Sequence, residues 1–325
     1  MEIRQEISTL RGDPAPQRVA QVALERAASA WRARPDVAEM LADLDAFASC
    51  RSLAECAALS RLFDEESAAA DTLAGSLASG IGAALRDVPL GHVPFRHHAD
   101  GIFAMLLLAQ SGNVTLSLVA IDGDAMARIP APATVNYSPC EMWERFLSGT
   151  ATARLVENRN IAGGDADLRV RDIVLAPGKV VCRDADRQAL QVTRAQGCLV
   201  SLRLQRRRRN AGLSREFTLT DGTLARQAAG NPRDSRVEMM MALLGRMERA
   251  DAAPLLARIA RGDGSEALRW QALRECLALD TATGFAALCD VAGRGGDPLG
   301  TAASALRAQL VAAYPQLAEI EPCPA

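Results

Sequence analysis

The hydrophobic pattern changes twice along the chain and divides the sequence into three regions. From about residue 16 to residue 86, apolar residues recur every three or four positions, which is the spacing of amphipathic helices. From Val88 to about Gln227 the apolar runs become short and alternating, as in β-strands. The helical spacing returns from Gly230 onward. The pattern therefore predicts an α+β protein with a helical subdomain, a central β domain and a second helical module.

The first region is expected to form a helical subdomain over residues 16–87, after a flexible arm of residues 1–15. Pro35 ends the first helical run, because proline interrupts a helix. Ser52 and Glu55 have the spacing of a capping box and predict the start of a short third helix. The expected helices are Arg18–Arg34, Asp36–Phe47, Ser52–Phe63 and Glu65–Leu85.

The β domain is expected over residues 88–229 and is organised around Gly91–Gly123, which holds the three histidines and the most apolar run. Two buried strands, Ile102–Gln110 and Val114–Ile121, are expected on either side of a turn. Asp221-Gly222 predicts a second tight hairpin. Ser148-Gly149 and Gln196-Gly197 are expected to separate strands. About eleven short strands in such a stretch are typical of a β-sandwich, a jelly roll or a small barrel.

The last region, residues 230–325, predicts a module of helix pairs. Leu255-Leu256 and Phe285-Ala286 are offset by about 30 residues, which is close to one helix-pair repeat. Methionine is frequent in the first of these helices, where it suits either core packing, which we expect, or an adaptable binding face. Those methionines are Met239, Met240, Met241 and Met247.

Two stretches resemble known families. The opening Asp251-x-x-Pro254-Leu255-Leu256 and the later Arg269-Trp270-Gln271-Ala272-Leu273 are similar to the paired helices of HEAT repeats. This resemblance implies a short docking module.

The central region resembles a cupin-like jelly roll. Ser138-Pro139-Cys140-Glu141 leads into Trp143–Ala151, and Leu175-Ala176-Pro177-Gly178 follows, in the manner of the strand–glycine–strand hairpins of cupins. Cupin metal sites commonly combine a His-x-His pair, a Glu and a later His. Every histidine here precedes residue 99, so the sequence departs from that pattern.

Composition gives the chain no preference for nucleic acid or membranes. It has 325 residues, a net charge of −2 and 49% apolar residues, which is ordinary for a globular protein. Lys179 is the single lysine. The eight cysteines contain no C-x-x-C pair and are expected to be buried free thiols. Residues 1–17 have no apolar core of signal-peptide type, and polar residues interrupt Phe103–Ile121 at its mid-point, so we expect a cytoplasmic protein without a membrane span.

The histidine cluster is the candidate metal site. His98 and Asp100 form a His-x-Asp pair that would share one face of a strand. With His92 or His97 as a third ligand, they would hold Fe(II) or another divalent metal. Two alternatives remain: polar residues at a domain junction, hydrogen-bonded to Asp100 and the backbone, or a metal-free pocket in which Arg96 and a histidine bind an anion.

An arginine run is the candidate partner-binding site. It is expected on a hairpin loop between Cys198–Gln205 and Arg215–Thr220. Guanidinium groups there would hold an acidic partner or a phosphate, whereas the alternative is a solvated loop. Aromatic residues of the sort that stack on single-stranded nucleic acid are not interleaved with the run. The run consists of Arg206, Arg207, Arg208 and Arg209. Arg203, in the strand before it, and Arg96 are the further residues expected to bind the partner.

No nucleophile or phosphate-loop motif is present. Glu141 and Glu144 would face opposite sides of a strand, which excludes a paired-carboxylate site. The leading hypothesis is a binding or accessory protein that docks a partner protein or peptide through its β domain and helical repeats. The alternatives are a non-haem iron oxygenase of cupin type and a metal-free sensor of a small ligand.

Overall fold

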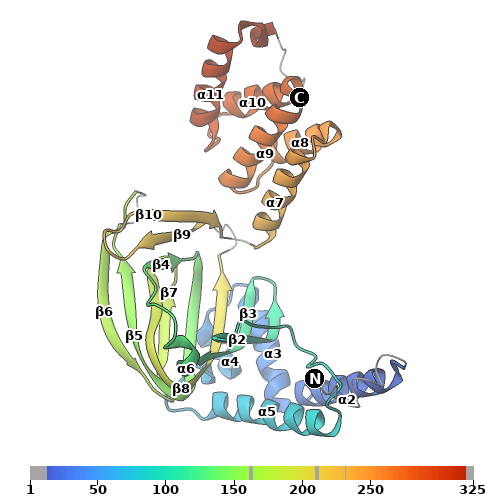
Figure 1. Ribbon diagram of the computed structural model, residues 1–325, viewed down its shortest axis with the longest axis vertical. Coiled ribbons are helices and arrows are strands. Elements are labelled where there is room, and N and C mark those ends of the chain that lie inside the picture. Colours follow the sequence, from blue (N-terminus) through green and yellow to red (C-terminus); the bar gives the residue numbers. More distant parts are fainter. Residues whose placement is uncertain (1–12, 161–163, 209–211, 231, 320–325) are drawn as a thin grey trace. The chain divides into compact units, whose positions relative to one another are not determined.

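The computed structural model describes residues 13–160, 164–208, 212–230 and 232–319 and separates into two compact units (Figure 1). The first unit comprises residues 1–209 and 217–224, and the second comprises residues 210–216 and 225–325. Helices precede and follow a central antiparallel β region, which confirms the predicted α+β class. A search of the described part of the chain finds no helix with the length and apolar character needed to span a membrane.

In the described residues of the first unit, three of the expected helices are found with their bounds shifted by up to four residues, and the third of the four expected helices differs. The capping box is present, with the Ser52 amide donating to Glu55 Oε2 at 2.7 Å. It closes a short 3-10 turn, Leu53–Glu55, and the backbone then bends at Cys56 before α4, so the single helix expected at Ser52–Phe63 is two elements. The helices are α2 (Ala15–Arg32), α3 (Pro35–Ala48), α4 (Ala57–Arg61) and α5 (Ala69–Asp87).

A seven-stranded sheet forms the centre of the first unit. Its order is β1-β2-β3-β8-β5-β6, and β7 also pairs with β5. The hairpin of β2 and β3 confirms the two strands expected around the turn at Gly112. The strands are β1 (His97–Ala99), β2 (Phe103–Ser111), β3 (Val114–Asp122), β5 (Cys140–Asn158), β6 (Leu168–Leu175), β7 (Val180–Asp184) and β8 (Gln188–Arg207).

The strands β5 and β8 each take the place of two shorter strands that the sequence predicted, because their glycines bend the strands instead of ending them. Gly149 has φ +80° and Gly197 has φ +65°. The pairing of β5 with β8 shifts register on both sides of Ser148, as in a β-bulge. A Cβ on Gly149 would lie 2.5 Å from the Cys198 carbonyl oxygen, so the close approach of the two strands requires glycine.

The helices cover one face of this sheet, which we call the helix face. Phe47 of α3 packs edge-on against Trp143 of β5, in a core that includes the fully buried Leu116, Leu202 and Leu204. Figure 1 shows α3 beside β2 and β3, in agreement with their contacts. The buried Arg145 holds the turn before α5, because it donates to the Asp64 and Ser67 carbonyl oxygens, and it forms an ion pair with Asp71 of α5 at 3.5 Å.

The opposite side of the sheet, which we call the inner face, carries further apolar clusters. One surrounds Phe146, Leu175 and Leu199. Another joins Tyr137 of β4 (Thr134–Tyr137) to Phe217 of β9 (Leu213–Thr218), whose rings meet edge to face. The hairpin of β9 and β10 (Leu224–Ala229) turns around Asp221-Gly222 as predicted, but residues 219–223 separate the strands, so the turn is longer than the tight one expected.

The second unit contains the C-terminal helices, which lie in the region where the sequence predicted a helical module. Arg269 of α9 is buried and forms a bidentate pair with Asp297, at 3.0 and 2.5 Å. The expected core packing of the methionines holds for Met241, which is buried, but is wrong for Met239, Met240 and Met247, which are exposed. The helices are α7 (Pro232–Arg246), α8 (Ala253–Arg261), α9 (Glu266–Leu279), α10 (Thr281–Gly293) and α11 (Gly300–Ala313).

Candidate functional site

The structure places the histidine cluster on and beside the exposed edge strand β1. His97 Nδ1 lies 3.0 Å from the Phe95 carbonyl oxygen, and Gln17 lies within 3.3 Å of His92 Nε2. Among the described residues, no three His, Cys, Asp or Glu side chains are grouped as metal ligands. The metal hypothesis for His92, His97, His98 and Asp100 therefore stays a prediction.

Asp100 has a structural task in this segment. Its Oδ1 accepts hydrogen bonds from the amides of Phe103 and Ile102, at 2.8 and 3.0 Å. These two hydrogen bonds lower the pKa of the Asp100 carboxyl group. They also close the turn between β1 and β2. Arg96 is exposed just before β1.

The arginine run begins inside a strand, so the expectation of a hairpin loop is wrong for Arg206 and Arg207. Both lie in β8, which continues because β3 and β5 pair with it on either side up to these residues. Arg208 follows the strand and forms ion pairs with Asp184 and Asp186 at 2.7 and 3.3 Å. Arg209 lies outside the described residues.

Arg206 joins the sheet to the helices. Its Nε donates to Glu141 at 2.7 Å, and its Nη1 donates to the Arg51 carbonyl oxygen at 3.0 Å. The guanidinium carbon lies 4.1 Å from the centre of the Phe47 ring, within the range of a cation–π contact. This arginine therefore stabilises the packing of α3 on the helix face.

A group of charged side chains is buried on the inner face, and we call it the Glu144 cluster: Glu144, Arg183, Ser201 and Arg203. Glu144 Oε1 accepts from Arg203 Nη2 at 2.8 Å and from Ser201 Oγ at 2.9 Å. Its Oε2 accepts from Arg183 Nη1 at 3.1 Å. The side chains of Glu144 and Arg183 are 4% and 6% exposed.

The register of the sheet brings the Glu144 cluster together. Glu144 of β5 lies opposite Arg203 of β8, and Arg183 of β7 lies opposite Met142 of β5. Residues two apart on a strand share a face, so Met142 and Glu144 both face inward. Glu141 pairs instead with Arg206 on the helix face, which confirms that the two glutamates point to opposite sides.

Two arginines share one carboxylate in this cluster. Burial raises the pKa of Glu144, but the charges of Arg203 and Arg183 and their hydrogen bonds outweigh it and bring the pKa to about 2. Burial also lowers the pKa of Arg183, and the neighbouring Arg203 lowers it further, while Glu144 acts in the opposite direction. The carboxylate is therefore ionised throughout the physiological range.

Sequence reasoning assigned only Arg203 of this cluster to a site, and to a different one. A usable signal existed: Ser201 and Arg203 alternate with the apolar Leu202 and Leu204, so these two polar residues share one face of β8. That face would be solvated in an open sheet. Only the pairing of β5, β7 and β8 reveals that it is buried.

The cysteines partly follow the expectation of buried thiols. Cys56, Cys140 and Cys276 are buried, whereas Cys182 and Cys198 are exposed. Burial is the main cause of the raised pKa of the Cys140 thiol, which therefore stays protonated at neutral pH. This thiol lacks the lowered pKa of a nucleophile.

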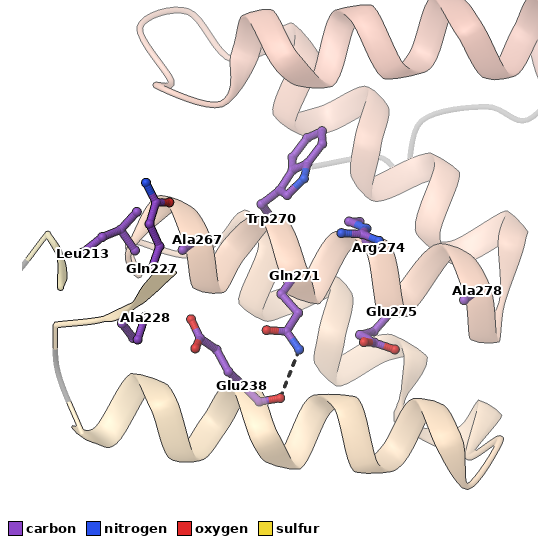
Figure 2. A pocket seen from close by; sticks show the side chains of 11 residues that line it. Leu213, Gln227, Ala228, Glu238, Ala267, Trp270, Gln271, Arg274, Glu275 and Ala278 are labelled. Atoms are coloured by element: carbon purple, nitrogen blue, oxygen red, sulfur yellow. Dashed lines mark hydrogen bonds between the residues drawn. The ribbon is translucent and has the colours of Figure 1, made fainter. Parts of the chain in front are cut away.

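The second unit carries two open grooves on either side of α9. Three residues at helical spacing form the strip between them, which we call the α9 ridge: Trp270, Arg274 and Ala278. The first groove, of about 490 Å³, lies between this ridge and α7 (Figure 2). The second, of about 730 Å³, extends from the ridge to α11 and the segment that follows it.

The two grooves differ in chemistry. Figure 2 shows Glu238 reaching from α7 toward α9, where Gln271 donates to its backbone carbonyl oxygen at 3.1 Å. Burial, with a smaller contribution from Asp234, raises the pKa of Glu238. Glu275 lines the same groove. The second groove is lined mainly by apolar side chains: Leu277, Leu306, Leu310, Tyr314 and Leu317.

Comparison with known proteins gives a likeness in fold to part of the chain. No family model matches, and no curated protein matches. A cupin superfamily protein from Desulfitobacterium hafniense is 18% identical, over 34% of this chain and 83% of that one, with a TM-score of 0.23. KdgF from Halomonas is 13% identical, over 35% of this chain and 89% of that one, with a TM-score of 0.25.

Proposed function

We propose that this chain is a binding protein that docks a segment of a partner protein along the α9 ridge. The observation that carries the proposal is the position of Trp270 and Arg274 between two grooves that both open to solvent. Tryptophan, tyrosine and arginine are the residues most enriched among interface positions with large binding energies. The ridge and the adjoining Tyr314 supply all three types.

The lining of the grooves defines the partner that would fit. A leucine-sized or aromatic side chain suits the second groove, where Leu306, Leu310 and Leu317 lie. A lysine or arginine suits the first groove, where Glu238 and Glu275 would pair with it and Trp270 would stack on it. We therefore expect a partner segment that presents apolar and basic side chains to the ridge.

An exposed apolar stripe on α7 and the turn that follows it supports the same function. Met239, Leu243 and Met247 follow one another at four-residue spacing and are 64%, 56% and 55% exposed. Methionine side chains are flexible and adapt to varied surfaces. A stripe of this kind would widen the docking surface beyond the first groove.

The helix pairs also agree with the proposed HEAT-like character of the module. In the second unit α8 contacts both α9 and α10, and α9 contacts both α7 and α10. Helix-pair repeats stack in this way and present one series of helices to partners. The arginines predicted to bind the partner are less suited to it, because Arg203, Arg206 and Arg208 are engaged in ion pairs within the first unit.

A charge reversal on the ridge tests the proposal. The tagged full chain would be isolated from cells that naturally express it, and co-purifying proteins would be quantified by mass spectrometry. We expect Arg274→Glu to deplete a specific partner by about tenfold, equivalent to about 1.4 kcal/mol. The control is Arg258→Glu, a charge on α8 that is also exposed but lies outside both grooves. Equal partner recovery with both folded variants would contradict the proposal.

A further inference from the structure

The Glu144 cluster contains one more positive than negative charge. Arg183 and Arg203 both pair with Glu144, and no second acidic side chain pairs with either of them among the described residues. The neighbouring Cys140 thiol is neutral, because burial raises its pKa. An uncompensated charge on a buried face is unfavourable unless an opposite charge accompanies it. The cluster is therefore short of one negative charge.

The hydrogen bonds show where that charge would bind. Glu144 accepts three hydrogen bonds at Oε1 and one at Oε2, so its capacity is largely used. Arg183 Nη2, in contrast, donates to Met142 Sδ at 3.0 Å. A thioether is a weak acceptor, and a buried guanidinium gains more from an anionic oxygen.

The surroundings permit such a ligand to arrive. The Arg203 side chain is 23% exposed, so solvent reaches one side of the cluster. Met142 is only half-buried, and its flexible side chain is the group that an incoming oxygen would displace. Ser117 of β3 is buried opposite Arg203 in the register and adds a hydroxyl group to the same face.

We propose that Arg183 and Arg203 form a binding site for one carboxylate group of a small organic acid, on the inner face of β5, β7 and β8. A carboxylate supplies one negative charge, which equals the excess of the cluster. Its two oxygens match the planar fork of a guanidinium. A phosphate group carries more negative charge than a carboxylate. The additional negative charge would lie close to the carboxylate of Glu144, which would repel it. This site is in the first unit and is independent of the α9 ridge.

The test uses the purified full chain and two probes of nearly equal shape. Butyrate carries the carboxylate, whereas butyramide replaces it with a neutral amide. Thermal unfolding of the first unit would be measured at constant ionic strength with each probe and, in separate samples, with inorganic phosphate. We expect butyrate to raise the unfolding temperature and butyramide to leave it unchanged. Equal effects of the two, no effect of butyrate, or stabilisation by phosphate alone would overturn the proposal.

Two variants identify the site of binding. Arg203→Met leaves Glu144 paired with Arg183, so the excess charge disappears and butyrate should bind about tenfold more weakly or not at all. Glu144→Gln increases the excess, so butyrate should bind about tenfold more tightly. The second variant keeps the proposal testable if Arg203→Met fails to fold. Arg154→Met, on an exposed arginine of β5, is the control and should bind butyrate as the native chain does. Unchanged affinity in Glu144→Gln would refute the assignment to this cluster.

Discussion

Replacing Glu144 by glutamine should destabilise the first unit by about 3 kcal/mol at neutral pH. The pKa of the carboxyl group falls from 4.5 to about 2, and a shift of one pKa unit corresponds to about 1.4 kcal/mol. The ion pairs give a second value for this loss of stability, because Glu144→Gln leaves Arg183 and Arg203 without a counter-ion. Removal of one partner from a buried ion pair typically costs about 3–5 kcal/mol.

The pH dependence of this loss follows from the direction of the pKa shift. The folded pKa of Glu144 is lowered, so its contribution is fully present above the unfolded value of 4.5 and is lost as the pH falls toward about 2. The native chain should therefore lose stability over that interval, whereas Glu144→Gln should not lose this part. The difference between the two proteins should shrink from about 3 kcal/mol at pH 7 to near zero at pH 2.

Denaturant unfolding followed by tryptophan fluorescence would measure the effect. A Trp270→Phe background leaves Trp31 and Trp143, both in the first unit, as the reporters. The matched control is Glu141→Gln, on the same strand but half-exposed beside Arg206, which should cost about 1 kcal/mol or less. Equal losses in the two variants, or a loss for Glu144→Gln that does not vary with pH, would refute the electrostatic account.

Three further substitutions test the packing inside each unit. Asp297→Asn leaves the buried Arg269 without its counter-ion and should destabilise the second unit by about 3 kcal/mol, measured by calorimetry; a loss below about 1 kcal/mol would contradict this. Gly149→Ala should cost more than about 1 kcal/mol, because its φ is positive and its Cβ would clash with the Cys198 carbonyl oxygen. Gly75→Ala in α5, where an added Cβ meets no atom within 4 Å, should stabilise the first unit by about 0.5–1 kcal/mol. A loss of stability would show that helix propensity does not determine the effect of a substitution at this position.

The sequence predicted the helices and the class of fold because each depends on local periodicity. Pro35 and the Ser52 capping box act within a few residues, and both work as expected. Gly149 was misread because a glycine that ends a strand and one that bends it look alike locally. What distinguishes them is the approach of Cys198, which lies about fifty residues away in the chain.

The Glu144 cluster was beyond sequence reasoning for a related reason. Arg203 pairs with a glutamate 59 positions earlier, and Arg183 with the same glutamate 39 positions earlier. Neither partner is local, and a long strand such as β8 can leave a run of arginines on two different faces. Arg206 therefore stacks on Phe47 while Arg203 pairs with Glu144 on the inner face, although both were assigned to one partner-binding site.

Site-specific photo-crosslinking from the α9 ridge tests the proposed function most directly. A photoreactive side chain would replace Ala278, which is exposed on the ridge, or Arg258, which is exposed on α8 outside the grooves. After irradiation in cells that naturally express the protein, we expect a discrete adduct with one partner from position 278 and none from position 258. The yield of the adduct should fall about tenfold when Arg274→Glu is added. The same adducts from both positions, or an adduct whose yield Arg274→Glu leaves unchanged, would contradict docking along the ridge.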